Sequence, residues 1–396
     1  MQSERSVYFF NPLSSPHGMI MTETTTVETA VTQKRSRPRF NDRQQENIAG
    51  WLMVSPAILL ILGFLIVPFL MAFGLAFTNQ RLISPNPTEY VGSRNFARLL
   101  TLRTLAIDPI VDEDTGELVR DEDGNLTYPR TRTFTRNNPD HPELDGLQEW
   151  LSKTMGETRW VLLAGDAVFM RSLVNTFYFA LVIVPVQAGL GLVLALLVNQ
   201  KIRGVNLFRT VYFVPVVVSM VVVAILWKFI YDGQNGLLNN LLGIITFGLF
   251  EPVDWLGNTK TAMPAIIGMS IWQGVGFHMI IWLAGLQTIP ATLYEAAAVE
   301  GAGRWAQFKY VTWPGLRPTA VFVLVTITIA AFGLFTQIDV MTRGGPLDST
   351  TTVIFQMVQR GYEKQDIAMG SAISVVFFVM VLIVAFTQRI ITRERE

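Results

Sequence analysis

The sequence predicts an all-α protein that crosses a membrane six times, with a small extracytoplasmic insert of α/β or β-hairpin structure between its first and second spans. Composition supports this prediction, because 50% of the residues are hydrophobic and only 16% are charged, whereas soluble domains normally carry about 25% charged residues. Six apolar runs are long enough to cross about 30 Å of hydrocarbon. Basic residues concentrate in the connections on one side of these runs, as they do in cytoplasmic loops.

Residues 1–47 are expected to form a disordered cytoplasmic tail. The segment is rich in Thr, Glu and basic residues, and it has too few apolar residues to build a core. No long apolar run follows Met1, so no secretory signal peptide is predicted. Two later methionines, Met19 and Met21, leave the true start codon open.

Residues 48–396 are expected to form one membrane domain. Its spans are predicted at 51–78, 173–199, 210–231, 263–286, 315–337 and 367–388. Several spans contain a proline, which membrane helices tolerate because neighbouring helices satisfy the freed carbonyl groups.

The distribution of lysine and arginine predicts that both termini are cytoplasmic. Basic residues precede the first span, follow the last one, and lie in the connections 200–209 and 290–318. The opposite short connections carry fewer: Lys260, Arg343, Arg360 and Lys364. Since cytoplasmic loops are enriched in basic residues, the connection 290–318 is predicted to be cytoplasmic.

The long connection 79–170 is then predicted to be extracytoplasmic. Short β-type runs near Val111, Leu118 and Thr127 alternate with Asp/Gly turns, which indicates hairpin structure. The turns at 112–116 and 121–125 lack the sixth-position glycine of a calcium-binding EF-hand, so plain turns are favoured.

The end of this insert is expected to contain a short amphipathic helix at 140–155. Its apolar residues recur at helical spacing. They are Leu144, Leu147, Trp150 and Leu151.

Residues 290–318 form a polar interruption between two strongly apolar runs. Thr292-Leu-Tyr-Glu295 has the spacing of a capping box, with Thr292 as N-cap and Glu295 at N3. A short helix should run from there to Gly301, where the missing β-carbon permits a turn. A second short helix should lead to Pro314 and Pro318, which reset the chain into the fifth span.

The order of residues in this connection resembles the cytoplasmic coupling loop of permease subunits in binding-protein-dependent ABC importers. The matching stretch is Tyr294-Glu-Ala-Ala-Ala-Val-Glu-Gly301, followed by Val311-Thr-Trp-Pro314. Further stretches resemble the carbohydrate branch of that family, which takes up maltose, glycerol phosphate and multiple sugars: Arg203-Gly-Val-Asn-Leu-Phe-Arg209, Leu283-Ala-Gly-Leu-Gln287 and Thr342-Arg-Gly-Gly-Pro346. The resemblance covers 51–100 and 169–396 and omits most of the insert.

The resemblance implies the permease subunit of an ATP-driven importer in a bacterial or archaeal plasma membrane, which translocates a sugar, oligosaccharide or polyol. It implies a second permease subunit, usually a different chain, two ATPase subunits that hold ATP and Mg, and an extracytoplasmic solute-binding protein. The residues implied in contact with the ATPase are Glu295, Ala296, Ala297, Gly301 and Pro314. Those implied in contact with the binding protein are Gly344, Gly345 and Pro346.

Polar side chains inside the spans are candidates for the substrate path, because polar groups in hydrocarbon are costly and usually face a cavity or another helix. Together with aromatic rings that suit sugars, the candidates are Trp272, Gln273, Thr326, Thr328, Phe332 and Gln337. Further polar candidates are Asn175, Gln187, Ser219, Ser270 and His278. For each of them a hydrogen bond between helices is the more frequent alternative. The apolar residues at 329–334 stand where maltose importers carry asparagines, which argues against maltose.

Several classes of function are excluded or disfavoured. A net charge of zero gives no bulk positive field for nucleic acid, and the absence of cysteine excludes disulfides and thiolate chemistry. No P-loop motif is present, so no catalytic residue, metal or cofactor is expected in this chain. An ion-gradient-driven secondary transporter or channel is the alternative, although the spans lack a central charge. A membrane anchor or sensor is a third possibility. The particular cargo and the role of the insert are not defined by the sequence.

Overall fold

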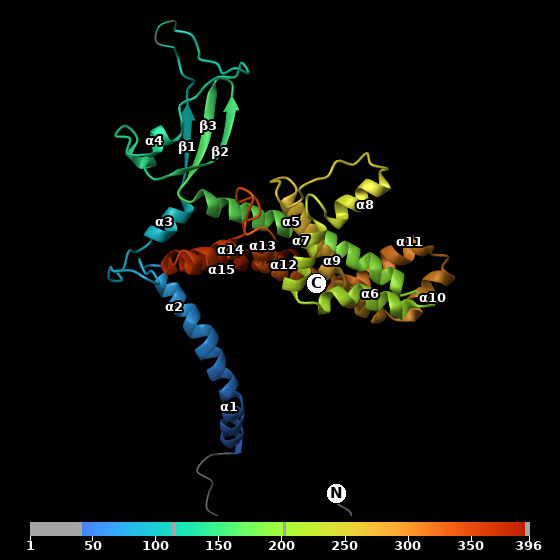
Figure 1. Ribbon diagram of the computed structural model, residues 1–396. Coiled ribbons are helices and arrows are strands. Elements are labelled where there is room, and N and C mark those ends of the chain that lie inside the picture. The colour runs from blue at the N-terminus through green and yellow to red at the C-terminus, as the bar shows by residue number, and fades with distance from the viewer. Residues whose placement is uncertain (1–41, 113, 115, 201–202, 393–396) are drawn as a thin grey trace, which may run out of the picture. The chain divides into compact units, whose positions relative to one another are not determined.

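The computed structural model describes residues 42–112, 114, 116–200 and 203–392 (Figure 1). The predicted tail lies outside the described residues up to position 41, and its last residues are already helical. Contacts divide the chain into two compact units, one ending at Ile61 and one beginning at Leu62.

The first unit is described by helix α1 (Asp42–Ile61), which contains Pro56. The described side chains of this helix are exposed or half-exposed, and most of them are apolar. The stretch Glu46–Leu75 is long and apolar enough to cross a membrane. Since apolar side chains without a protein partner are stable in hydrocarbon, this surface suits lipid.

The second unit is mostly helical, as predicted. Its long helices are α5 (Ala167–Val198), α9 (Ala262–Gln287), α12 (Trp313–Phe332) and α15 (Ile367–Thr392), and α2 (Val67–Leu75) follows a π turn at Leu62–Ile66. Among the described residues, five helices are long and apolar enough to span a membrane, and a bent helix pair makes a sixth if it counts as one span. The number six therefore stays a prediction.

The bent pair lies where the third span was predicted as one run. It consists of α6 (Val205–Val217) and α7 (Met220–Ile230), which meet at 100°. The two residues between these helices, Val218 and Ser219, both have extended ψ angles. Three consecutive valines at 216–218 favour this break, because β-branched residues lose side-chain freedom in a helix. The fifth span also differs, since α12 ends at Phe332 instead of at residue 337.

Close approaches at glycine hold the core of the second unit together. A β-carbon at Gly191 of α5 would lie 3.3 Å from the His278 side chain of α9. At Gly276 of α9 it would collide with the carbonyl oxygen of Tyr212 in α6. Small residues let membrane helices approach in this way. Gly191 and Gly276 therefore serve helix packing. The largest fully buried side chains here include Phe179, Ile266, Met269, Met279, Leu316 and Ile327.

Shorter helices connect these long ones. They are α3 (Arg94–Leu100), α4 (Arg132–Thr135), α8 (Leu237–Ile245), α10 (Ala291–Val299), α11 (Arg304–Gln307), α13 (Thr336–Met341) and α14 (Val353–Val358), with a 3-10 turn at Pro142–Leu144 and π turns at Phe308–Thr312 and Gln359–Glu363.

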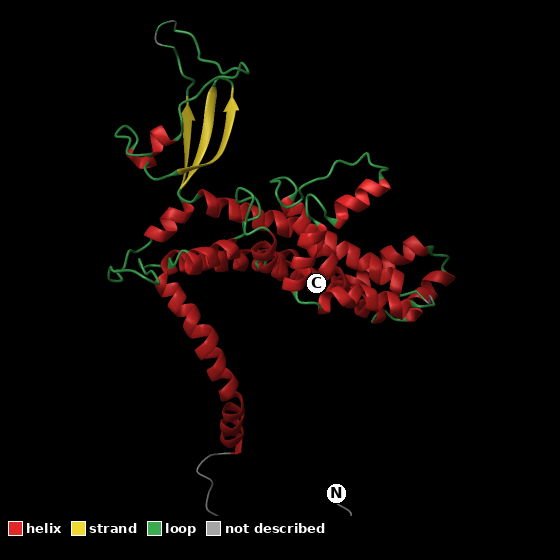
Figure 2. Ribbon diagram, viewed as in Figure 1, coloured by secondary structure: helices red, strands yellow, loops and turns green. Residues whose placement is uncertain are grey.

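The insert contains a small antiparallel sheet, which confirms the expected β structure (Figure 2). Strands β1 (Leu102–Ile107) and β2 (Gln148–Met155) both pair with the central β3 (Thr158–Ala164). A compact core fills one face of the sheet: Leu105, Ile107, Leu144, Val161 and Leu163. The runs predicted as a hairpin near Val111 and Leu118 form only isolated bridges.

The amphipathic helix predicted at 140–155 is wrong. After the 3-10 turn the chain enters β2, which turns back into β3 through Gly156, whose φ is +68°. The run Thr-Arg-Trp-Val-Leu-Leu-Ala of β3 is rich in strand-forming residues, and pairing with it gives β2 its backbone partners. The helical spacing of four apolar residues favours a helix less strongly than pairing with β3 favours a strand.

The acidic segment at 121–125 is a plain turn, as predicted. The carboxylate of Asp121 accepts hydrogen bonds from the backbone of Asp123 at 3.1 Å and of Asn125 at 2.8 Å. Gly124 supplies the left-handed position with φ +83°.

Candidate functional site

The polar connection between α9 and α12 is a compact turn built around Gly301. Helix α10 ends at Val299, and Gly301 has φ +80°, which the missing β-carbon makes inexpensive. Beyond it, α11, the π turn and α12 form one continuous stretch from Arg304 to Phe332. The expectation that the two prolines would separate a second short helix from the fifth span is therefore wrong. Pro314 lies in the first turn of α12 and Pro318 lies inside that helix.

The predicted capping box is also wrong. Pro290 occupies the N-cap position with an extended ψ of 132°, and α10 begins at Ala291. Thr292 is thus already inside the helix, and no side chain caps its start. The proline fixes this start two residues too early for the box, with its ring restricting the backbone there. Glu295 is consequently not engaged in a capping bond.

Hydrogen bonds tie α10 to the helix that follows it. The hydroxyl groups of Tyr294 and Thr312 lie 3.0 Å apart. The Gln307 side chain donates to the carbonyl of Ala302 at 3.1 Å, and the Ala302 amide donates to Ala297 at 2.9 Å. These bonds close the connection on itself and join α10 to the start of α12.

The outer face of this connection is exposed and carries large apolar side chains beside two carboxylates, those of Glu295 and Glu300. Val299 and Trp305 are 90% and 74% exposed, and Leu293 and Tyr310 are exposed beside them. Glu295 is exposed and has no hydrogen bond or ion pair with the described residues. The other residues that the resemblance implies in ATPase contact are exposed as well, except the half-buried Ala297: Ala296, Gly301 and Pro314. Sequence reasoning missed Val299 and Trp305, although large apolar side chains in a polar turn were a usable signal.

A cavity of about 240 Å³ lies among α5, α6, α7, α9 and α12. Three predicted path residues line it together: Gln273, Thr326 and Gln337. Three of the further polar candidates also line it: Gln187, Ser270 and His278. The structure thus brings distant polar residues from separate spans to one place.

Hydrogen-bonding capacity in this cavity is only partly used. The Ser270 hydroxyl is buried without a partner among the described residues. Gln187 donates to the Ser270 carbonyl at 3.3 Å, and Thr326 donates to its own helix at 2.9 Å. Unused polar groups in hydrocarbon usually face a cavity that water or a ligand occupies.

The other three predicted path residues lie elsewhere. Thr328 donates to the Leu324 carbonyl of its own helix at 2.7 Å. Trp272 stacks edge-on against Trp227 with ring centroids 5.5 Å apart, and Phe332 is buried against Phe177. Thr328 and Phe332 line a separate cavity of about 290 Å³ between α12 and α15, and Trp272 packs against its aromatic neighbour.

The loop at Gly344, Gly345 and Pro346 is anchored by α5. Arg171 donates to the Leu347 carbonyl at 2.6 Å, and the Asn175 amide donates to two further loop carbonyls, those of Asp348 and Thr351. Asn175 thus links a helix to a loop, and not two helices as the alternative interpretation expected. Leu347 remains highly exposed at the tip.

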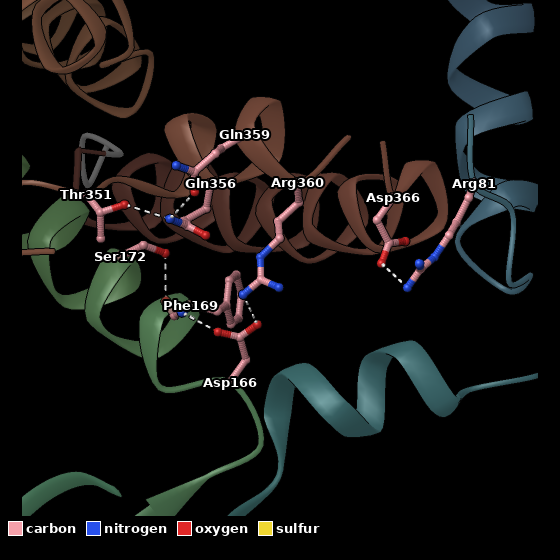
Figure 3. Close-up of polar contacts among 9 residues, drawn as sticks. All are labelled: Arg81, Asp166, Phe169, Ser172, Thr351, Gln356, Gln359, Arg360 and Asp366. Atoms are coloured by element: carbon pink, nitrogen blue, oxygen red, sulfur yellow. Dashed lines mark hydrogen bonds and ion pairs between the residues drawn. The ribbon is translucent and has the colours of Figure 1, made fainter. Parts of the chain in front are cut away.

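Figure 3 shows a polar cluster near this loop that sequence reasoning missed. Asp166, the N-cap of α5, accepts from the Phe169 amide at 3.0 Å and from Arg360 at 2.7 Å. Gln356 donates to the Thr351 hydroxyl at 3.0 Å in the same cluster. The ion-pair partners are separated by 194 residues in sequence, so no local pattern indicates the pair.

Comparison with known proteins gives a consistent result. A family model described as "Binding-protein-dependent transport system inner membrane component" matches residues 187–395. The lactose transport system permease protein LacF of Rhizobium radiobacter is 35% identical over 248 residues, which are 62% of this chain and 83% of that protein.

Two solved structures are similar in fold. The first is a bacterial ABC transporter involved in the import of the acidic polysaccharide alginate, with a TM-score of 0.62, 21% identity and coverage of 89% of this chain and 100% of that chain. The second is a bacterial alginate ABC transporter in complex with a periplasmic protein that holds an alginate pentasaccharide. Its TM-score is 0.53 at 25% identity, with 58% of this chain and 79% of that chain covered.

Proposed function

Because the chain belongs to the family of binding-protein-dependent transport system inner membrane components, we propose that it is the permease subunit of an ATP-driven importer for a saccharide or polyol. An extracytoplasmic binding protein delivers the cargo. The carbohydrate class is supported by the cargo named for the similar proteins, lactose in one and alginate in another. The matched region includes the connection 290–318 and the helices that line the polar cavity.

In this proposal the chain has six spans, cytoplasmic termini and a cytoplasmic connection at 290–318. The exposed face of α10, with Glu295 at its middle, docks on a partner ATPase that holds ATP and Mg. A second permease subunit completes the path. The observation that supports this assignment is the exposed apolar surface around Glu295, since exposed apolar patches often mark protein interfaces.

Force from the ATPase reaches the spans through the closed turn. Since Tyr294 and Thr312 join α10 to the start of α12, movement of α10 displaces α12 and its polar residues in the cavity. The cargo would then exchange hydrogen bonds with Gln273, Thr326 and Gln337 as the cavity opens to either side. The loop at Gly344–Pro346 faces the binding protein in this scheme.

The experiment is uptake by the importer reconstituted with its ATPase and binding protein. Gly301→Asp is expected to abolish uptake and to lower co-purification of the ATPase, because a side chain at this exposed left-handed position intrudes on the docking face. Gly248→Asp is the matched control, since Gly248 has φ +85° and equally open surroundings in a different loop. Equal loss of uptake in both variants would indicate a folding defect. ATP-independent uptake driven by an ion gradient would favour the secondary transporter.

A further inference from the structure

The insert contains a cavity that the transport function above does not use. It has a volume of about 730 Å³ and lies beside α4 and the ends of β2 and β3. Four arginines and one carboxylate line it: Arg130, Arg132, Arg136, Arg159 and Glu149. Cavities of roughly 300–1,000 Å³ are the usual size for small-molecule ligands.

One of the four arginines is already neutralised. Arg159 donates to Glu149 at 2.8 Å and to the Ser152 hydroxyl at 3.2 Å, and Glu149 also accepts from Thr131. Burial raises the pKa of Glu149, but hydrogen bonds from Thr131 and Ser152 and the Arg159 charge outweigh it and lower the pKa. Glu149 therefore stays ionised and holds Arg159 in place at the wall.

The other three arginines have no such partner. No hydrogen bond or ion pair joins the side chains of Arg130, Arg132 and Arg136 to any described residue. The four guanidinium groups and the one carboxylate together give the cavity lining a net charge of +3. Like charges gathered in this way repel each other, and a bound anion removes the repulsion. Guanidinium groups suit carboxylate and phosphate groups, because their planar forks donate two parallel hydrogen bonds.

Neutral hydrogen-bonding groups complete the lining. Thr135 is nearly buried at the wall, and Gln148 lies exposed beside it with a side chain that makes no hydrogen bond to the described residues. Hydroxyl and amide groups next to guanidinium groups match a ligand that carries both hydroxyl and carboxylate groups. A concave site of this size also favours a small ligand over the flatter surface of a protein partner.

We propose that this cavity binds an acidic oligosaccharide through its carboxylate groups, with Arg132 and Arg136 as the principal contacts. The ligand class rests on the proposed carbohydrate function, whereas the site itself is separate from the path through the spans. The insert then holds an anionic sugar outside the membrane domain.

The test measures binding of trigalacturonate to the full-length protein in detergent by calorimetry, with uncharged maltotriose as the comparison ligand. Trigalacturonate is expected to bind, and the double variant R132Q/R136Q is expected to weaken binding at least tenfold, since charge-assisted hydrogen bonds are the strong ones. R120Q is the matched control, because Arg120 lies outside the cavity and donates to the Gly124 carbonyl. R132K/R136K should restore part of the affinity, and added salt should reduce it.

Several outcomes would overturn the proposal. Equal affinity for maltotriose, or equal affinity of the R132Q/R136Q and unaltered proteins, removes the site. Full displacement by inorganic phosphate at equal concentration shows a general anion site without sugar recognition. Thermal unfolding of each variant checks that the insert is folded. The assay needs neither ATPase nor binding protein, so its failure leaves the importer assignment standing.

Discussion

Asp166 joins three parts of the molecule through a single carboxylate. It ends the connection from β3, caps α5 and pairs with Arg360, and it is nearly inaccessible to solvent. The Nε atom of Arg360 is buried without a hydrogen-bond partner among the described residues. The carboxylate is therefore the principal counter-ion that keeps this guanidinium stable in a poorly solvated place.

Replacing Asp166 by Asn should destabilise the protein by about 3–5 kcal/mol, because it leaves a buried charge unpaired. Thermal unfolding in detergent measures the loss. Glu363→Gln is the control, since the Arg343–Glu363 pair is 74% and 48% exposed at its side chains. Exposed pairs contribute about 0–1 kcal/mol. A similar small loss in both variants would contradict the assigned role of Asp166.

Glu149 predicts a pH dependence of the insert. Because its pKa in the folded state lies below the ordinary 4.5, its ionised form favours folding. That contribution is complete above about pH 4.5 and is lost as the pH falls through the lowered value.

The fluorescence of Trp150 and Trp160, which lie in strands β2 and β3 of the insert, follows the insert during acid titration. Glu149→Gln should lower stability at neutral pH and flatten the acid dependence. An unchanged acid profile in this variant would assign the dependence to other carboxylates.

At the scale of elements, glycine positions control how closely the helices pack. Gly276 of α9 faces the backbone of α6 at Tyr212, so the bent pair α6–α7 can lie against α9 only where a β-carbon is missing. The atom that an added β-carbon would meet belongs to the backbone of Tyr212, so no side-chain rotation can relieve the clash.

Gly276→Ala should therefore destabilise the protein by about 1–3 kcal/mol, the usual cost of overpacking. Gly243→Ala in α8 is the control, because a β-carbon there meets no atom within 4 Å. Ala at that helical position should be neutral or stabilising. Urea or thermal unfolding compares the two, and equal stability would mean that α6 moves away from α9 without cost.

Elements with a long apolar run were predictable from sequence, and those set by distant partners were not. The long helices α5, α9 and α15 lie where hydropathy predicts them, because burying backbone groups in hydrocarbon requires a helix. Strand β2 was predicted as a helix, since its pairing with β3 is invisible in its own spacing. Thr292 had the right neighbours for a capping box, but Pro290 moved the start of α10.

The residues of the candidate site also divide into those that the sequence predicts and those that it does not. The left-handed Gly301 was predictable because glycine next to a short helix has few other uses. Gln273 and Gln337 were chosen as polar residues in spans, and the structure places them at one cavity. Thr328 passed the same test, but it lies at a separate cavity between α12 and α15 and donates to its own backbone. Composition cannot tell which face of a helix a polar side chain occupies.

For the whole molecule, the absence of cysteine makes its topology directly measurable. Single cysteines at Arg304 and Gly248 report the α10–α11 connection and the α8–α9 loop. In intact cells, an impermeant maleimide should label the 248 variant, and the 304 variant should react only after lysis, as cytoplasmic termini require. Labelling of both positions from outside would reverse or remove the proposed orientation.

The attachment of the insert has one further consequence. Only Gly165 and Asp166 separate β3 from α5, and only Thr101 separates α3 from β1. The Gly165 amide donates to the Thr101 carbonyl at 3.0 Å, so the two attachments are joined to each other. The sheet is thus a stiff extension of α5, without slack. Any tilt of α5 during a transport cycle is enlarged at the far edge of the sheet, where a fluorophore would report it.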